Sequence, residues 1–198
     1  MTEQEIIGAT TAYKSILGNR KAYYLSTPIT TGLEFYLNKK DHSTLEWEDK
    51  DEVDQAVKNN LFLAEQTVLE LRNQTKTPII CPGSLHMKDW GQHEYMVFWR
   101  TTIKDYVWMI FFRDGWEYSI GCIEEFLYAK SIGVSTVSQH LYDDSTGAEI
   151  TYEKGIEMIQ KALEHLKSLG FTNLKYFQII PDLIEKHKPV IPVLKSES

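Results

Sequence analysis

Short runs of apolar residues alternate along the chain with longer stretches in which apolar residues recur at helical spacing. The runs span residues 22–26, 77–81, 106–112 and 134–137, and each has the length of a buried strand. The run 106–112 is apolar at every position, which is typical of a strand that is covered on both faces in a parallel sheet. The pattern therefore predicts four strands of one sheet.

The stretches between these runs predict helices, because their apolar residues recur about every three or four positions. The predicted helices span residues 3–17, 53–72, 92–104 and 152–169, and another follows the loop 114–121 and ends at Gly133. Strands that alternate with helices indicate an α/β fold. We expect a three-layer, doubly wound, mainly parallel sheet of the flavodoxin or Rossmann-like type, with helical N- and C-terminal extensions.

Residues 1–198 are long enough to bury a core and are expected to form a single domain. Its core would span residues 21–138, and residues 139–198 would form a C-terminal helix and tail. Within the tail, residues 176–180 are a candidate for one more strand. The polar and charged stretch 38–52 is interpreted as a solvated connection rather than a binding patch.

Composition and charge limit the classes of partner and the cellular compartment that we expect. The net charge of −7 argues against broad electrostatic binding to nucleic acid or anionic lipid. The two cysteines, Cys81 and Cys122, are too few for a disulfide framework and favour a reducing compartment. The first residues do not resemble a signal peptide, and no apolar run is long enough to span a membrane. We therefore expect a cytoplasmic protein with neither a nucleic-acid nor a membrane partner.

Polar side chains follow three of the predicted strands. The loops 26–32, 82–90 and 114–121 come after successive strands and carry hydroxyl, amide or charged groups. Open α/β sheets bind their ligands outside the carboxyl ends of the strands. The sequence therefore predicts that these loops converge on one crevice.

Two adjacent acids, Glu124 and Glu125, lie one turn into the helix that follows the loop 114–121. Neighbouring residues point about 100° apart around a helix, so only one of them can face the crevice. An acid near a helix start can also simply stabilise the helix dipole. Ser119 offers a hydroxyl beside helix N–H groups that suit an anion, or it caps the helix.

Two segments resemble the nucleoside 2-deoxyribosyltransferase superfamily. They are Tyr24-Leu-Ser-Thr-Pro-Ile-Thr-Thr-Gly32 and Asp114-Gly-Trp-Glu-Tyr-Ser-Ile-Gly-Cys-Ile-Glu-Glu-Phe-Leu-Tyr-Ala129. The second is most similar to a poorly characterised branch found in phage and bacterial genomes. The resemblance covers residues 23–137 and implies an enzyme that cleaves or transfers the N-glycosidic bond of a nucleoside or a nucleoside 5′-monophosphate.

By resemblance, Glu125 falls on the carboxylate nucleophile and Tyr24 on the tyrosine that orients it. Ser119 stands where transferases carry an aspartate and deoxynucleoside 5′-monophosphate N-hydrolases carry a phosphate-binding serine, which favours a monophosphate. Trp116 is a candidate to stack on the base. The other expected substrate-binding residues lie in the same two segments: Thr27, Pro28, Ile29, Thr30, Gly32, Asp114 and Gly121.

The chain departs from the family at a sugar-binding acid. Val97 stands where these enzymes usually carry an aspartate, and a valine cannot bind a sugar hydroxyl. Asp89 or Glu94 could take this role if the helix predicted at 92–104 is shifted. The departure leaves open a nucleotide-binding sensor on the same fold that has lost catalysis, and a purely structural protein remains a third reading.

A second departure affects the phosphate. Thr30 stands where the hydrolases place an arginine, so Arg100 or Arg113 would have to replace it. No metal or organic cofactor is expected, because the chemistry needs none and His86, His93 and Glu94 do not have a standard metal-ligand spacing. The expected partner is a nucleoside or nucleoside monophosphate, and the resemblance implies a homo-oligomer, a dimer or larger.

Overall fold

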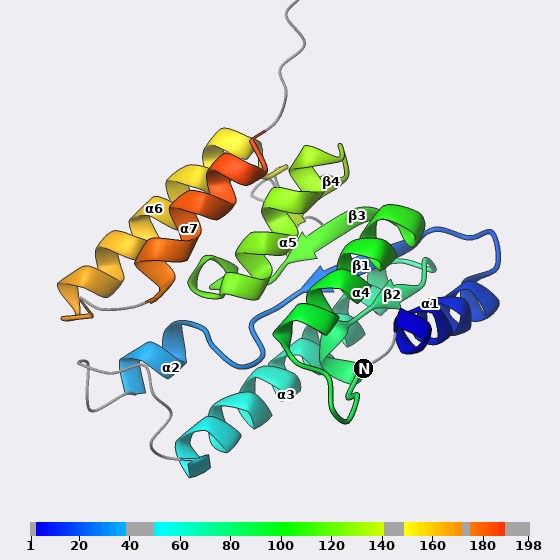
Figure 1. Ribbon diagram of the computed structural model, residues 1–198, viewed down its shortest axis with the longest axis horizontal. Helices are drawn as coiled ribbons and strands as arrows, with labels where there is room; N and C mark the ends of the chain where they lie inside the picture. The colour runs from blue at the N-terminus through cyan, green and yellow to red at the C-terminus, as the bar shows by residue number, and fades with distance from the viewer. Residues whose placement is uncertain (1–2, 39–49, 141–148, 172–174, 189–198) are drawn as a thin grey trace, which may run out of the picture.

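The computed structural model describes residues 3–38, 50–140, 149–171 and 175–188. Within them, a parallel four-stranded sheet lies between two layers of helices (Figure 1). The strands are β1 (Ala22–Ser26), β2 (Ile79–Ile80), β3 (Val107–Phe112) and β4 (Ser135–Ser138), in the order β2-β1-β3-β4. All three pairings are parallel, so the predicted three-layer α/β fold is confirmed.

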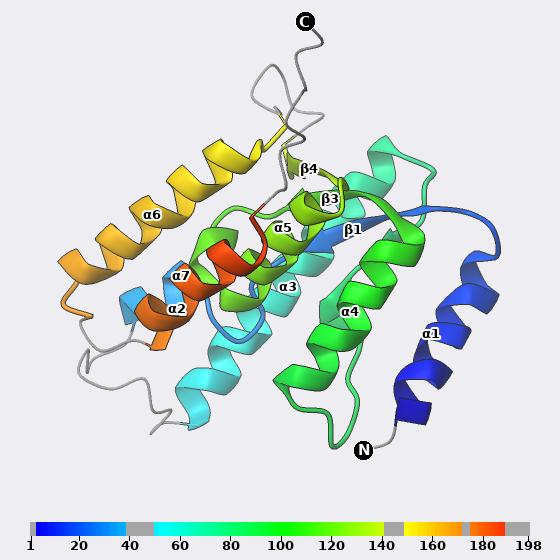
Figure 2. The ribbon, with the colours of Figure 1, turned by 45° about the horizontal axis from the view of Figure 1, so that its top comes forward.

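Helices cover both faces of the sheet. They are α1 (Glu3–Leu17), α2 (Leu33–Asn38), α3 (Lys50–Gln74), α4 (Gln92–Tyr106), α5 (Ile120–Ser131), α6 (Tyr152–Ser168) and α7 (Lys175–Lys186), with short helical turns η1 (Pro82–Ser84) and η2 (Trp116–Tyr118). The helix α3 packs on one face, and α4 and α5 pack on the other (Figures 1 and 2). The helix α1 packs beside α4, whereas α6 and α7 pack against α5.

Successive side chains of the central strands point into different layers, as strand geometry requires. Tyr24 and Phe112 join the large cluster formed with α4, α5 and α6, whereas Leu25 and Phe111 join the smaller cluster under α3. The strand β1 is buried along its whole length. On β3, however, Trp108 is 46% exposed, so the prediction of burial on both faces holds only beyond the amino end of that strand.

The extra strand predicted at 176–180 is wrong, because these residues lie in α7. The five-residue window hid a longer helical pattern, in which Ile180 and Leu183 are buried and point inward together. Pro181 lies inside this helix and removes one backbone hydrogen-bond donor without ending it.

Several boundaries differ from the sequence-based expectations. The helix α2 was not predicted, and α3 begins at Lys50 inside the stretch interpreted as a solvated connection. The rest of that stretch, residues 39–49, lies outside the described residues. The two cysteines are free thiols, as expected. Among the described helices, none is long and apolar enough to cross a membrane.

Candidate functional site

The carboxyl ends of β1 and β3 lie side by side at the centre of the sheet. The N–H of Arg113, directly after β3, donates to the carbonyl oxygen of Ser26 at 3.0 Å. The chain then passes through η2 and enters α5, which packs across this end of the sheet. This path places Glu125, one turn into α5, over the end of β1, where its side chain is only 7% exposed.

Two hydroxyl groups of β1 hold the Glu125 carboxylate. The Tyr24 hydroxyl donates to Oε1 at 2.5 Å, and the Ser26 hydroxyl donates to Oε2 at 2.6 Å. Residues two apart on a strand face the same side, so one strand presents both donors to one carboxylate. The neighbouring acid, Glu124, points away and forms an ion pair with Arg100. Glu125 is therefore the acid that faces the sheet.

Burial dominates the electrostatics of this group. It raises the pKa of Glu125 to about 7, and the negative charge of Glu124 adds to the rise, while the bonds from Ser26 and Tyr24 lower the pKa and oppose it. Burial and the adjacent carboxylate also raise the pKa of Tyr24 well above its usual value, so this hydroxyl keeps its proton. The site thus contains a carboxylate that changes charge near neutral pH beside two permanent donors.

Ser119 lies at the start of α5, is 6% exposed, and does not cap the helix with its side chain. Its hydroxyl instead hydrogen-bonds the Cys122 thiol, which also bonds Ser26. The capping alternative for Ser119 is therefore wrong. Burial raises the pKa of Cys122 to about 12, as expected of a structural thiol rather than a nucleophile.

The loop after β1 is pinned by a residue of α3. The Asn60 side-chain amide donates to the carbonyl oxygens of Ile29 at 3.0 Å and Thr31 at 2.9 Å. Gly32 closes the loop with φ of 130°, which a residue with a side chain rarely adopts. Thr27 and Pro28 are buried, whereas Thr30 is exposed, so this loop offers mainly backbone groups and one outward hydroxyl.

The other predicted loops reach the same edge. A Cβ atom added to Gly83 in η1 would lie 3.9 Å from Ile29, so the loop after β2 packs on the loop after β1. A Cβ atom on Gly121 would lie 3.9 Å from both the Ser119 hydroxyl and the Gln92 amide, which brings the starts of α4 and α5 together. The three loops therefore converge as predicted.

The proposed replacements for the missing sugar-binding acid do not lie at this carboxylate. Glu94 accepts a bond from the Gly91 N–H at 2.8 Å and so caps its own helix. Asp89 occupies an exposed turn with φ of 69°. Val97 is 37% exposed on α4. Among the described residues, no hydrogen bond joins any of these three side chains to Glu125.

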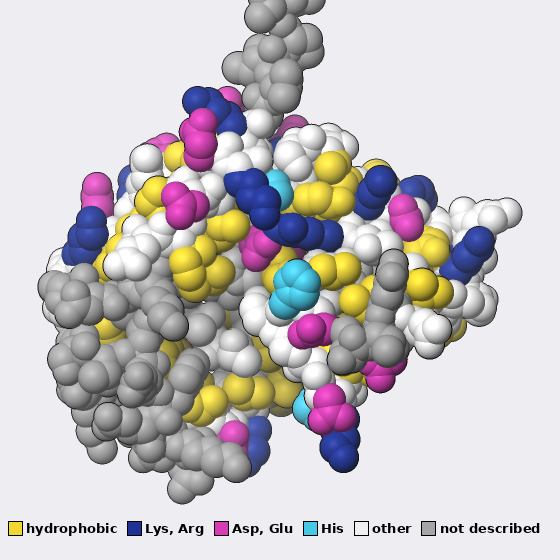
Figure 3. Space-filling view, in the orientation of Figure 1, with side chains coloured by type: hydrophobic (Ala, Val, Ile, Leu, Met, Phe, Trp, Pro, Cys, Tyr) yellow, Lys and Arg dark blue, Asp and Glu magenta, His cyan; other side chains and the backbone are white. Residues whose placement is uncertain are grey.

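Two arginines were candidates for the phosphate, and the structure separates them. Arg100 pairs with Glu124, lies over the Tyr128 ring at 5.6 Å and approaches His187 at 3.4 Å. Figure 3 shows basic, acidic and histidine side chains together near the centre of the face, where α4, α5 and the end of α7 meet. The Arg100 guanidinium group therefore already has bonded partners in this cluster.

Arg113, by contrast, is half-buried at the carboxyl edge of the sheet. Burial lowers its pKa, and the charges of Glu34 and Asp114 and the Cys122 thiol oppose that shift. Within the described part of the chain, no hydrogen bond or ion pair engages its guanidinium group. A partly desolvated cation without a bonded partner is suited to hold an anion.

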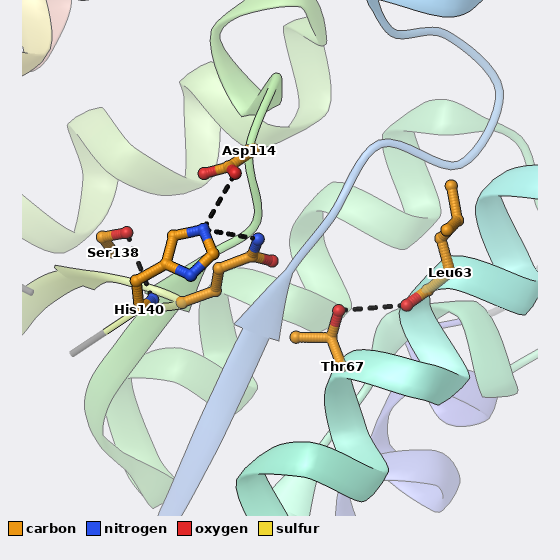
Figure 4. A network of polar contacts seen from close by, with 6 residues as sticks. Leu63, Thr67, Asp114, Ser138 and His140 are labelled. Atoms are coloured by element: carbon orange, nitrogen blue, oxygen red, sulfur yellow. Dashed lines mark hydrogen bonds and ion pairs between the residues drawn. The ribbon is translucent and has the colours of Figure 1, made fainter. Parts of the chain in front are cut away.

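Two residues that were predicted to contact the substrate, Trp116 and Asp114, have other partners in the structure. Trp116 is 1% exposed and packs 4.9 Å from both Phe112 and Phe126, so it belongs to the core and the interpretation as a base-stacking residue is wrong. Asp114 is largely exposed and accepts a bond from His140 at 2.9 Å, as Figure 4 shows. It therefore lies beside the end of β4.

Sequence reasoning missed two residues of the site, Ser26 and Asn60. The signal for Ser26 was its spacing of two from Tyr24 on a buried strand. The signal for Asn60 was an amide at an apolar position of the α3 pattern, four residues before the buried Ala64.

Among the described residues, no group of three or more histidine, cysteine, aspartate or glutamate side chains could hold a metal ion. Comparisons of the chain with protein-family models, with curated proteins and with solved structures found no match. The functional conclusion therefore depends on the geometry of the site and on the motifs themselves.

Proposed function

We propose that the protein cleaves or transfers the N-glycosidic bond of a nucleoside or, preferably, a nucleoside 5′-monophosphate, with Glu125 as nucleophile. One observation carries the proposal: a buried carboxylate at the carboxyl edge of the sheet accepts bonds from Tyr24 and Ser26 on both of its oxygens. A carboxylate held in one orientation is prepared for attack on an anomeric carbon. The resemblance of the two segments supports the same role.

The reaction would proceed in two displacements, as in a retaining glycosidase. A Glu125 oxygen forms a bond to the anomeric carbon while the carbon–nitrogen bond breaks. The base leaves with that electron pair and takes a proton from water. In the second step water attacks the same carbon, the bond to Glu125 breaks, and a proton passes to solvent. In the transfer reaction, a nitrogen of a second base replaces the water.

The preference for a monophosphate is supported by two groups. Ser119 offers a buried hydroxyl that does not cap its helix, and Arg113 offers a guanidinium group that forms no hydrogen bond or ion pair with a described side chain. A phosphate would gain charge-assisted bonds from both. A carboxylate at the Ser119 position would repel it instead.

A chromatographic screen of nucleosides and nucleoside 5′-monophosphates, with and without an acceptor base, tests the proposal. We expect free base from at least one substrate, and its loss in Glu125→Gln. The matched control is Glu124→Gln, which changes the adjacent acid and should retain base release. Full activity in Glu125→Gln would exclude this nucleophile.

The phosphate preference has its own test. Arg113→Gln should weaken binding of monophosphates by about tenfold or more and leave the corresponding nucleosides nearly unaffected, because a charged bond is worth about 1.5–3 kcal/mol. An equal loss for both substrate classes would contradict a phosphate contact.

A second candidate function is nucleotide sensing without cleavage. It is favoured by Glu94, since the acid that could replace the missing sugar ligand caps α4 instead. Calorimetry distinguishes the two candidates. Tight monophosphate binding with no free base after long incubation would support the sensor, whereas base release would support the enzyme.

A further inference from the structure

Two hydroxyl groups hold the Glu125 carboxylate, and the second of them, from Ser26, was not among the predicted site residues. Ser26 is fully buried, and its hydroxyl lies 2.6 Å from Oε2, opposite the Tyr24 bond to Oε1. One donor would leave the carboxylate free to turn about its last bond. Two donors on different oxygens remove that freedom.

We propose that Ser26 is a positioning residue for Glu125: its hydroxyl holds Oε2 in place and stabilises the charged form of the carboxylate. This inference deepens the proposed function, on which its catalytic consequence rests. Each carboxylate oxygen has a second lone pair, so the two hydrogen bonds leave an electron pair free to attack. The orientation of that pair is then set by β1 rather than by the flexible side chain.

The neighbours of Glu125 make this donor necessary. Glu124 on α5 is a like charge, and Cys122 on the same helix is a neutral thiol. Tyr24 on β1 stays protonated and donates one bond. Arg113 follows β3 at the same edge of the sheet, and among the described residues no ion pair joins it to Glu125. Stabilisation of the buried charge therefore comes from neutral hydroxyl donors.

The loss of a bond to a charged group shifts proton affinity measurably. Burial raises the pKa of Glu125 to about 7 despite both bonds, so Ser26→Ala should raise it further. We expect a rise of about one to two pH units. Ser26→Thr retains the hydroxyl and suits a strand, and it should restore most of the original value.

The experiment is a carbon-13 NMR titration of protein labelled at the glutamate carboxyl carbons. The Glu125 signal is identified by its loss in Glu125→Gln. Ser26→Ala should move the titration midpoint upward and Ser26→Thr should return it. Thr136→Val is the matched control, since it removes a fully buried strand hydroxyl that donates to the Ile150 carbonyl oxygen and not to Glu125, and it should leave the midpoint unchanged.

Thermal unfolding of each variant shows whether it folds, and only folded variants are compared. An unchanged midpoint in folded Ser26→Ala would overturn the inference. The titration needs no substrate, so the positioning role can stand even if no base is released and the proposed function fails. If base is released, the acidic limb of the kcat/KM profile should move with the NMR midpoint.

Discussion

Replacing Glu125 by glutamine should stabilise the protein, and by more at higher pH. Glutamine has nearly the same shape as glutamate, and its carbonyl oxygen can still accept a bond from Tyr24 or Ser26. What it removes is the charge, which is costly because the group is 7% exposed. A buried carboxylate is thus expected to lower the stability of the fold that holds it.

The magnitude follows from the shift in proton affinity. Burial raises the pKa of Glu125 from its ordinary value of 4.5 to about 7, so the folded state holds its proton more tightly than the unfolded state does. Below pH 4.5 both states are protonated and no difference arises. Between these two values the wild type loses stability as pH rises, and the loss is complete above about pH 7. A pKa that folding raises from 4.5 to about 7 corresponds to a loss of about 3 kcal/mol in unfolding free energy.

The assay is thermal unfolding by circular dichroism from pH 4.5 to 8.5. For a chain of this size, about 3 kcal/mol corresponds to roughly 6–12 °C in Tm. The difference between Glu125→Gln and the wild type should be near zero at the acidic end and reach this range at the basic end. Glu124→Gln is the control, since it breaks the ion pair with Arg100 and should not stabilise at any pH. A Tm difference for Glu125→Gln that is independent of pH would refute the reasoning.

Three further predictions concern packing and loop conformation. Gly155→Ala should lower the unfolding free energy measured by urea denaturation by about 1–3 kcal/mol, because the added Cβ would overlap the packed ring of Phe126. Gly8→Ala has open space around the added Cβ and should instead raise the unfolding free energy by about 0.5–1 kcal/mol. Asn60→Asp should lower the unfolding free energy by about 1–3 kcal/mol and weaken nucleotide binding in calorimetry, because the substitution removes both hydrogen bonds from the Asn60 amide to the loop after β1. The control Asn59→Asp changes an exposed neighbour and should have neither effect. Gly115→Ala should cost about 1 kcal/mol by the same urea measurement, because φ is 81° there.

The sequence was sufficient for the parts of the fold that depend on local patterns. Runs such as 106–112 have a strand signal in their own residues, and the alternation with helices implies parallel pairing. Helical spacing also shows that only one of Glu124 and Glu125 can face the sheet, whereas the choice of Glu125 came from the resemblance. The boundaries of β2 and α2 were less predictable, because short elements contain too few residues to show a period.

The contacts that complete the site were not predictable from local patterns. Ser26 reaches Glu125 across 99 positions of the chain, and Asn60 reaches Ile29 across 31. Nothing in the neighbourhood of either residue marks its partner. Trp116 was misread for the same reason, because only the packed structure shows it enclosed by rings from β3 and α5.

The helices beyond the region of resemblance have a structural role at the site. The helix α6 packs so closely on α5 that Gly155 leaves no room for a Cβ atom beside Phe126. The Tyr118 hydroxyl, one residue before Ser119, bonds the His165 ring at 2.8 Å and ties η2 to the same helix. Both contacts lie within one or two residues of a proposed site group, Glu125 or Ser119. Helix α6 therefore supports the loop and helix that position these groups, and we infer that it belongs to the same folding unit as the sheet.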